Sequence, residues 1–164
     1  TAFAVNKVLD VVKQSHPHIE TEMLDLKDYK VEFCDGRNPV DYTGDTKTVI
    51  EKVQETDFFV MGTPIFQSSI PGTLKNLFDL VPTSAFHHKV MGLIASGGTY
   101  HHYLVVENQL KPILGYFRAY VAPSYVYVQD EQYNANNEII DPEIDQRLEK
   151  LADEIVMMQT KLKK

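Results

Sequence analysis

Hydrophobic residues along the chain follow two alternating spacings. Segments with an apolar residue at every third or fourth position predict amphipathic helices, and unbroken apolar runs predict strands that are buried on both faces. Strand and helix patterns alternate, which is typical of a parallel sheet with helices on both faces. The expected strands are residues 19–26, 57–62, 90–95 and 118–128, and the expected helices are residues 5–12, 46–56, 71–81, 101–114 and a long final segment that begins at Asp141-Pro142.

The chain opens on a helix, with Thr1 placed as its N-cap. Doubly wound sheets normally open on a central strand, and the loop after that strand is a favoured ligand site. A parallel sheet without its central strand would have two unpaired inner edges, which is costly. We therefore expect a first strand and its loop, roughly ten to fifteen residues, to lie outside this sequence.

Length and composition indicate one ordinary folded domain. A chain of 164 residues can bury one full hydrophobic core, and 43% hydrophobic with 24% charged residues is typical of soluble globular proteins. No internal repeat, low-complexity tract or linker interrupts the pattern. We expect residues 1–164 to form a single domain.

Charge and cysteine content exclude several classes of partner. With 16 basic and 23 acidic residues the net charge is −7, which argues against nucleic acid or an anionic membrane as the main partner. An anionic small ligand stays compatible, because backbone N–H groups and a helix N-terminus can bind it. Cys34 is the one cysteine, so an internal disulfide or a cysteine metal cluster is excluded. With no signal peptide or membrane helix in the pattern, we expect a cytoplasmic protein.

The first candidate site is the loop TPIFQSSIPG, which follows the apolar run 57–62. Pro64 keeps Thr63 extended, so the next apolar and aromatic side chains would stand beside exposed backbone amides. In open α/β sheets, ligands bind at the carboxyl ends of the strands, where this loop lies. The candidate residues are Thr63, Pro64, Ile65, Phe66, Gln67 and Ser68.

The second candidate loop, Ser96-Gly97-Gly98-Thr99, follows the next buried strand and so lies at the same sheet edge. The two glycines leave backbone amides uncovered, with the hydroxyl groups of Ser96 and Thr99 beside them. A flat heterocycle with a polar edge suits such a place, since one face meets apolar side chains and the edge meets main-chain groups. Isoalloxazine has this shape, so the two loops together predict a flavin site.

These residues match a known family pattern. TPIFQSSIPGTLKNLFD resembles the segment T-P-[IVL]-Y-x-x-S-x-x-G-x-L-K-N-x-[FL]-D of the NADPH-dependent FMN reductases, which belong to the flavodoxin-like superfamily of NAD(P)H-dependent oxidoreductases and azoreductases. ASGGTYHHYLVVENQLKPIL resembles the family's second flavin loop and the helix after it. The resemblance runs from Thr1 to about Val128.

The resemblance implies an α/β three-layer sandwich with a five-stranded parallel sheet of order 2-1-3-4-5 that binds FMN. The family's phosphate loop follows the first strand, and Thr1 resembles the threonine that closes it. The family's loop tyrosine is Phe66 here, which keeps ring stacking but loses the hydroxyl group. Relatives form homodimers or homotetramers, so the resemblance implies a homo-oligomer.

Three functional classes share this topology. The first is a reductase in which FMN takes hydride from NADPH or NADH and passes electrons to free flavin, a quinone or an azo compound, so no protein side chain is expected to be catalytic. The second is a flavodoxin-type electron carrier, which usually sandwiches its flavin between aromatic rings. The chain has no Trp and no aromatic tip on the Gly-Gly loop, which favours the enzyme. A signalling receiver is excluded, because that module needs an aspartate at the end of its third strand, and the corresponding predicted strand, 57–62, is followed by Thr63 after Gly62.

Four other residues stay open to two interpretations each. His101 and His102 point about 100° apart on a helix and lack a carboxylate partner, so a metal site is disfavoured; they either shape the substrate pocket or lie on the surface. Cys34 is a redox thiol or, as we favour, a loop thiol without a role. Arg37 either reaches a phosphate of NADPH or is solvated.

Overall fold

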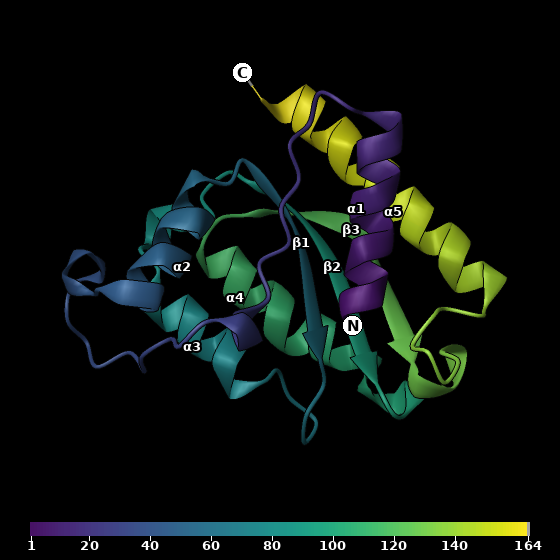
Figure 1. The fold of residues 1–164 in the computed structure, drawn as a ribbon, viewed down its shortest axis with the longest axis horizontal. Helices are drawn as coiled ribbons and strands as arrows, with labels where there is room; N and C mark the ends of the chain where they lie inside the picture. The colour runs from purple at the N-terminus through teal and green to yellow at the C-terminus, as the bar shows by residue number, and fades with distance from the viewer. Residues whose placement is uncertain (164) are drawn as a thin grey trace.

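The computed structural model describes residues 1–163 and has a parallel sheet at its centre. The sheet consists of β1 (Phe58–Pro64), β2 (Val90–Gly97) and β3 (Tyr120–Gln129) in the order β1-β2-β3 (Figure 1). Three of the four predicted strands are therefore confirmed, each displaced by no more than a few residues. The order matches the 3-4-5 part of the predicted sheet.

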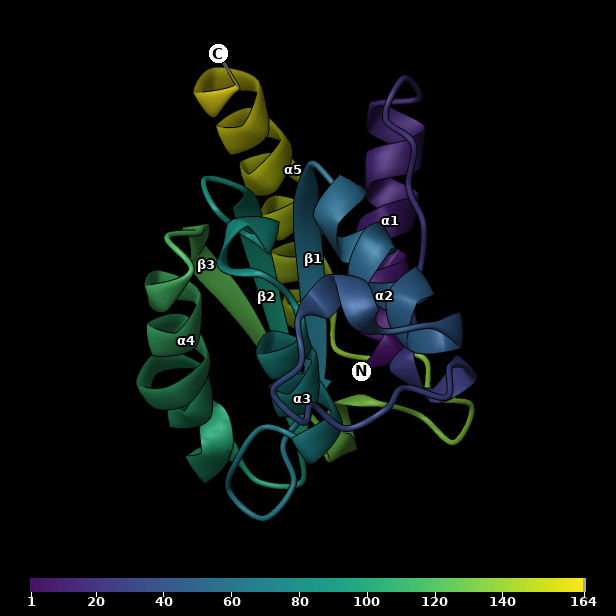
Figure 2. The same ribbon diagram turned by 90° about the vertical axis from the view of Figure 1, so that its left-hand side faces the viewer.

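Helices cover both faces of this sheet and complete three layers (Figure 2). One face carries α1 (Ala2–Ser15) and α5 (Pro142–Leu162). The other face carries α2 (Gly44–Glu55), α3 (Gly72–Leu80) and α4 (Lys111–Tyr116). Short 3-10 turns connect these elements at Leu26–Asp28, Pro39–Asp41, Thr83–Ala85, Tyr100–Tyr103 and Asp130–Gln132. Among residues 1–163, no helix is both long and apolar enough to cross a membrane.

Strand β2 divides the interior into two cores, because it is buried along its whole length. Met91 and Leu93 pack into the core beneath α2 and α3, whereas Val90 and Ile94 pack into the core beneath α1 and α5. This alternation explains why the sequence shows a continuous apolar run rather than an alternating one. Parallel pairing on both sides of β2 places the carboxyl ends of all three strands at one edge of the sheet.

The prediction of a strand at residues 19–26 is wrong. The segment is extended or bent but belongs to no strand, and it ends in a 3-10 turn at Leu26–Asp28. A strand needs a neighbour for its hydrogen bonds, and within residues 1–163 no strand lies on the edge of β1 that faces away from β2. Leu24 and Leu26 instead pack partly buried against the core beneath α2 and α3.

The N-termini of α1 and α5 differ in their capping hydrogen bonds. Asp141 caps α5 as predicted, since its side chain accepts a hydrogen bond of 2.9 Å from the Glu143 N–H. Thr1 stands at the N-cap position of α1 but makes no capping hydrogen bond, because its hydroxyl group bonds to the Ser96 hydroxyl instead. Thr1 is therefore the N-cap residue of α1, as predicted, but without a side-chain capping bond, and it reaches the second candidate loop.

The helix predicted at residues 101–114 is interrupted, as Pro112 indicated. A 3-10 turn at Tyr100–Tyr103 leads into a π-helical turn at Val106–Leu110, and regular α-helix resumes only at Lys111. Proline lacks an N–H group, and its ring clashes with the carbonyl group four residues earlier, here that of Asn108. The π-helical turn ends at Leu110, two residues before the proline, so the irregular backbone and Pro112 occur together.

Helix α4 ends in a left-handed residue that is not glycine. The Ala119 N–H bonds to the Leu114 carbonyl and the Arg118 N–H bonds to the Gly115 carbonyl, which is the Schellman pattern, and Arg118 has φ +56°. Glycine adopts this conformation without a Cβ penalty. We expect Arg118→Gly to raise the free energy of unfolding by about 0.5–1 kcal/mol in urea titrations. A loss of stability would contradict the assigned helix end.

Candidate functional site

The two candidate loops touch each other at the carboxyl ends of β1 and β2. Pro64 stands opposite Ser96 in the parallel register, and the Ile65 N–H donates to the Ser96 carbonyl at 2.7 Å. Ile65 is buried between the loops, whereas the Phe66 side chain is 61% exposed. The sequence prediction that these loops share one sheet edge is thus confirmed by the structure.

The first loop contains a tight turn across residues 66–69. The N–H groups of Phe66 and Ser69 each donate to the other residue's carbonyl at 3.0 Å, and the two residues between them, Gln67 and Ser68, have φ of 50° and 59°. Two successive left-handed residues are typical of the tight hairpin turns that glycine and asparagine favour. This closed turn fixes the direction in which Phe66 projects into solvent.

The second loop depends on the absence of a side chain at Gly97. A Cβ added there would lie 2.6 Å from the Tyr127 hydroxyl oxygen. That hydroxyl group donates a hydrogen bond of 2.7 Å to the Thr99 carbonyl and so holds the loop from β3. Burial, reinforced by the nearby Asp130 carboxylate, raises the pKa of Tyr127, which therefore stays protonated and able to donate.

The hydroxyl groups of the two loops have different hydrogen-bond partners. Ser96 is buried and its hydroxyl group is bonded to that of Thr1, so Thr1 lies beside the second candidate loop. The Thr63 hydroxyl group donates to the Pro64 carbonyl at 3.0 Å and is thereby engaged by the backbone. A Cβ at Gly98 would lie 3.2 Å from a carboxylate oxygen of Asp130, an acidic neighbour at the loop tip.

Of the two predicted histidines, His102 has a side-chain hydrogen-bond contact with the first loop. Its Nε2 lies 3.2 Å from the Ser68 Oγ, and its Nδ1 is buried without a hydrogen-bond partner among residues 1–163. His101 is exposed, and no hydrogen bond links its side chain to the first loop in the described chain. Within the same residues, no three His, Cys, Asp or Glu side chains are grouped so that they could hold a metal ion.

Sequence reasoning missed two residues that support these loops, Tyr127 and Gln109. Tyr127 lies near the carboxyl end of β3 and reaches across β2 to Thr99. Gln109 lies in the π-helical turn and contacts both Ser68 and Ser69. The position of Tyr127 at the end of a predicted strand was an available signal, whereas no pattern in the sequence locates the side chain of Gln109.

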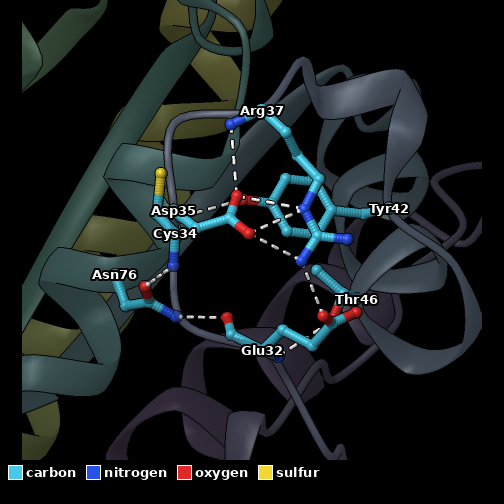
Figure 3. A network of polar contacts seen from close by, with 7 residues as sticks. All are labelled: Glu32, Cys34, Asp35, Arg37, Tyr42, Thr46 and Asn76. Atoms are coloured by element: carbon cyan, nitrogen blue, oxygen red, sulfur yellow. Dashed lines mark hydrogen bonds and ion pairs between the residues drawn. The ribbon is translucent and has the colours of Figure 1, made fainter.

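Arg37 is held within its own loop by a network of polar contacts (Figure 3). Its Nε lies 3.0 Å from both carboxylate oxygens of Asp35, its terminal nitrogen lies 2.9 Å from Glu32, and its guanidinium group covers the Tyr42 ring at 4.3 Å. Both carboxylates therefore compensate its charge. Of the two interpretations of Arg37, a solvated residue with local partners agrees better with this geometry than a phosphate ligand.

The same network ties the loop to α3. The Cys34 N–H donates to the Asn76 side-chain oxygen at 2.9 Å, and the Asn76 amide donates to the Glu32 carbonyl at 2.9 Å (Figure 3). The Cys34 thiol itself lies 3.3 Å from the Asp79 carbonyl oxygen. The backbone at Cys34 thus has a structural contact, which agrees with the interpretation of a loop thiol without a chemical role.

Acid should weaken this network. Hydrogen bonds from the Arg37 side chain and backbone hold the pKa of Asp35 well below its usual value of 3.8. A carboxyl group with a lowered pKa in the folded state stabilises the protein above its unfolded pKa, and this contribution disappears as the pH falls. We expect Asp35→Asn to flatten the fall in unfolding free energy between about pH 5 and pH 2. An unchanged acid slope in urea titrations would show that the network contributes nothing.

Comparisons with known proteins identify the family of this chain. The family described as NADPH-dependent FMN reductase matches residues 1–133. An NAD(P)H-dependent FAD/FMN reductase of Geobacillus thermodenitrificans is 54% identical over 163 residues, which cover 99% of this chain and 88% of that protein.

Solved structures show the same fold at low identity. An oxidoreductase of Corynebacterium diphtheriae has a TM-score of 0.76 at 21% identity and covers 98% of this chain and 86% of that one. Flavodoxin 1 of Bacillus cereus has a TM-score of 0.63 at 14% identity and covers 94% and 87%. The α/β flavodoxin-like fold predicted from the sequence is thus confirmed.

The chain belongs to the NADPH-dependent FMN reductase family. The predicted class is confirmed: the protein is an oxidoreductase enzyme of the NAD(P)H-dependent, flavin-using kind.

Proposed function

We propose that the protein binds FMN between the loops 63–70 and 96–99 and passes electrons from NADPH or NADH to free flavin, a quinone or an azo compound. The observation that carries this proposal is the joined pair of loops, in which the Ile65 N–H bonds to Ser96 and the exposed Phe66 ring stands beside them. A Cβ at Gly97 would lie 2.6 Å from the Tyr127 hydroxyl oxygen and 3.5 Å from the Ile65 Cβ, so the close approach of the two loops needs glycine here.

The residues present fit a flat, amphipathic ring system. Ile65 and Phe66 offer apolar contact for one face of isoalloxazine, and the backbone and hydroxyl groups of Ser96–Thr99 offer hydrogen bonds for its polar edge. Thr1, at the N-terminus of the 14-residue helix α1, lies where the partial positive charge of a helix favours an anionic group such as the FMN phosphate. When bound, FMN supplies hydride and electron transfer between the nicotinamide and the second substrate.

The task of the protein residues is binding and orientation. The closed turn at residues 66–69 holds Phe66 in one direction, and Tyr127 holds the Thr99 carbonyl, so both walls of the site are set before a ligand arrives. Such preorganisation reduces the ordering cost of binding. His102, placed against Ser68 with a buried and unpartnered Nδ1, borders the proposed substrate pocket.

We further propose that the complete sheet has the order 2-1-3-4-5, with β1, β2 and β3 as its third, fourth and fifth strands, in a single domain. Within residues 1–163, the edge of β1 that faces away from β2 pairs with no strand. Unpaired backbone groups are costly when buried, which supports a further strand at this edge.

We also propose a homodimer or homotetramer in the cytoplasm, where nicotinamide donors are kept reduced. Phe66, Tyr100 and Leu104 expose large apolar side chains around the site, and such groups are enriched in subunit interfaces. Light scattering of the purified protein tests this proposal, and a monomer at all concentrations would overturn it.

The role of Phe66 is tested by truncating its ring. Stacking of a flat heterocycle on an aromatic side chain contributes about 1–3 kcal/mol, so Phe66→Ala should raise the Kd for FMN by roughly tenfold or more. Phe66→Tyr keeps the ring and should bind FMN nearly as tightly as the parent. Flavin fluorescence titration measures both values. Equal affinities of the alanine and parent proteins would remove Phe66 from the site.

A further inference from the structure

Gln109 lies outside the first loop and forms hydrogen bonds to the turn at residues 66–69 at two points. Its side-chain oxygen lies 2.7 Å from the Ser69 hydroxyl group, and its amide nitrogen lies 3.3 Å from the Ser68 carbonyl oxygen. The chain distance between these partners is about 40 residues, so the contact is tertiary. His102 adds a third contact from the same helical segment, 3.2 Å from the Ser68 hydroxyl group.

The orientation of the Gln109 amide follows from its partners. The Ser68 carbonyl oxygen can only accept a hydrogen bond, so the amide NH₂ group must face it. The amide oxygen therefore faces Ser69, whose hydroxyl group donates. The amide oxygen and the amide nitrogen of Gln109 thus bond to two adjacent residues of the same turn. We call this pair of hydrogen bonds the Gln109 clamp.

The turn needs such support because of its backbone. Gln67 and Ser68 both have positive φ, and each non-glycine residue in that region loses roughly 1–2 kcal/mol relative to ordinary backbone. The two backbone hydrogen bonds between Phe66 and Ser69 offset part of this strain. The Ser68 carbonyl that Gln109 holds belongs to one of the strained residues, so the contact acts where the turn would otherwise relax.

The π-helical turn explains how Gln109 reaches this position. Gln109 lies within Val106–Leu110, and a π turn contains about one residue more than an α turn. Each added residue rotates the following side chains by about 100° around a helix axis. Gln109 lies inside this turn, so the irregular backbone sets the direction from which its amide reaches Ser68 and Ser69.

We propose that Gln109 is a positioning residue of the FMN site: through its two hydrogen bonds it locks the left-handed turn and so fixes the direction of Phe66 against the flavin ring. This inference rests on the proposed FMN site at the first loop. Gln109 itself touches the turn and not the reacting atoms, so its effect on FMN is transmitted through Phe66. The π-helical turn at Val106–Leu110 thereby helps to set the geometry of the first candidate loop.

The test compares Gln109→Leu, which keeps the bulk and removes both hydrogen bonds, with Asn108→Leu, an exposed neighbour in the same π turn. The first readout is amide hydrogen exchange at Phe66 and Ser69 in the flavin-free, full-length protein. We expect exchange to become about tenfold faster in Gln109→Leu and to stay unchanged in Asn108→Leu. The second readout is the Kd for FMN, which should rise about tenfold in Gln109→Leu only.

The outcomes test two claims separately: that Gln109 stabilises the turn at residues 66–69, and that FMN binds at this turn. Faster exchange with weaker FMN binding supports the proposal. Unchanged exchange overturns the clamp, whatever happens to FMN. Faster exchange with unchanged FMN affinity overturns the placement of FMN at this turn, and with it the role of Gln109 in binding. Ser69→Ala provides a second route should Gln109→Leu fold poorly: it removes one of the two bonds from the loop side, and it should give a smaller change in the same direction.

Discussion

Replacing Gly97 with valine is expected to weaken FMN binding by about a hundredfold, the loss that corresponds to roughly 2.7 kcal/mol. A Cβ at this position would lie 2.6 Å from the Tyr127 hydroxyl oxygen and 3.5 Å from the Ile65 Cβ, and valine adds two more methyl groups. Tyr127 would have to release the Thr99 carbonyl, and the second loop would move away from the first. Fluorescence titration of FMN with the purified variant measures the effect.

Gly115→Ala is the matched control for this change, because a Cβ at Gly115 meets no atom within 4 Å. Its FMN affinity should equal that of the parent protein. If Gly97→Val also retains parental affinity, the second loop takes no part in FMN binding. If it unfolds, which circular dichroism would reveal, Gly97→Ala offers a smaller perturbation at the same contact.

Truncating Phe86 to alanine is expected to lower the free energy of unfolding by about 3–5 kcal/mol, which is among the largest effects of a single core substitution. The Phe86 side chain is 0% exposed and contacts three other rings: Phe59, Phe78 and Phe117, at centroid distances of 5.3, 5.8 and 5.2 Å. All three pairs are edge-to-face, an arrangement that adds stability beyond buried area. Urea unfolding followed by circular dichroism measures the loss.

Phe33→Ala is the control for the Phe86 variant, because the Phe33 side chain is 81% exposed. Its unfolding free energy should change by less than about 0.5 kcal/mol. A loss of under about 1 kcal/mol in Phe86→Ala would contradict the four-ring core. The ring cluster lies beneath α3, the helix that follows the first loop, so its loss should also reduce FMN affinity at temperatures near unfolding.

Patterns that depend on local chemistry could be predicted from the sequence. The continuous apolar runs located β1 and β2, although only β2 is buried along its whole length and β1 is mostly half-buried. Asp141-Pro142 located the start of α5, because helix capping leaves a direct mark in the sequence. The segment 19–26 is half polar, which favoured a strand near a sheet edge, but it forms no strand, since strand formation depends on a pairing partner elsewhere. The contrast separates elements that are specified locally from those that need a neighbour.

In the candidate site, too, some features are specified locally and others depend on distant residues. Pro64 and the Gly97-Gly98 pair marked both loops, because proline and glycine have restricted or unusual backbone freedom. The left-handed backbone at Gln67 and Ser68 left no such mark, since neither residue type favours it. The support from Tyr127 and Gln109 depends on tertiary contacts with residues 28 to 41 positions away, which no local pattern reports.

The most direct test of the central claim is the visible spectrum of the full-length protein with FMN, followed anaerobically as NADPH and then NADH are added. A reductase that holds FMN between the two loops should shift the flavin absorption on binding and bleach it rapidly with at least one nicotinamide. The Gly97→Val protein should show neither change at the same FMN concentration. Bound flavin that stays oxidised with both donors would indicate an electron carrier, and an unshifted flavin spectrum in the parent protein would contradict the proposed site.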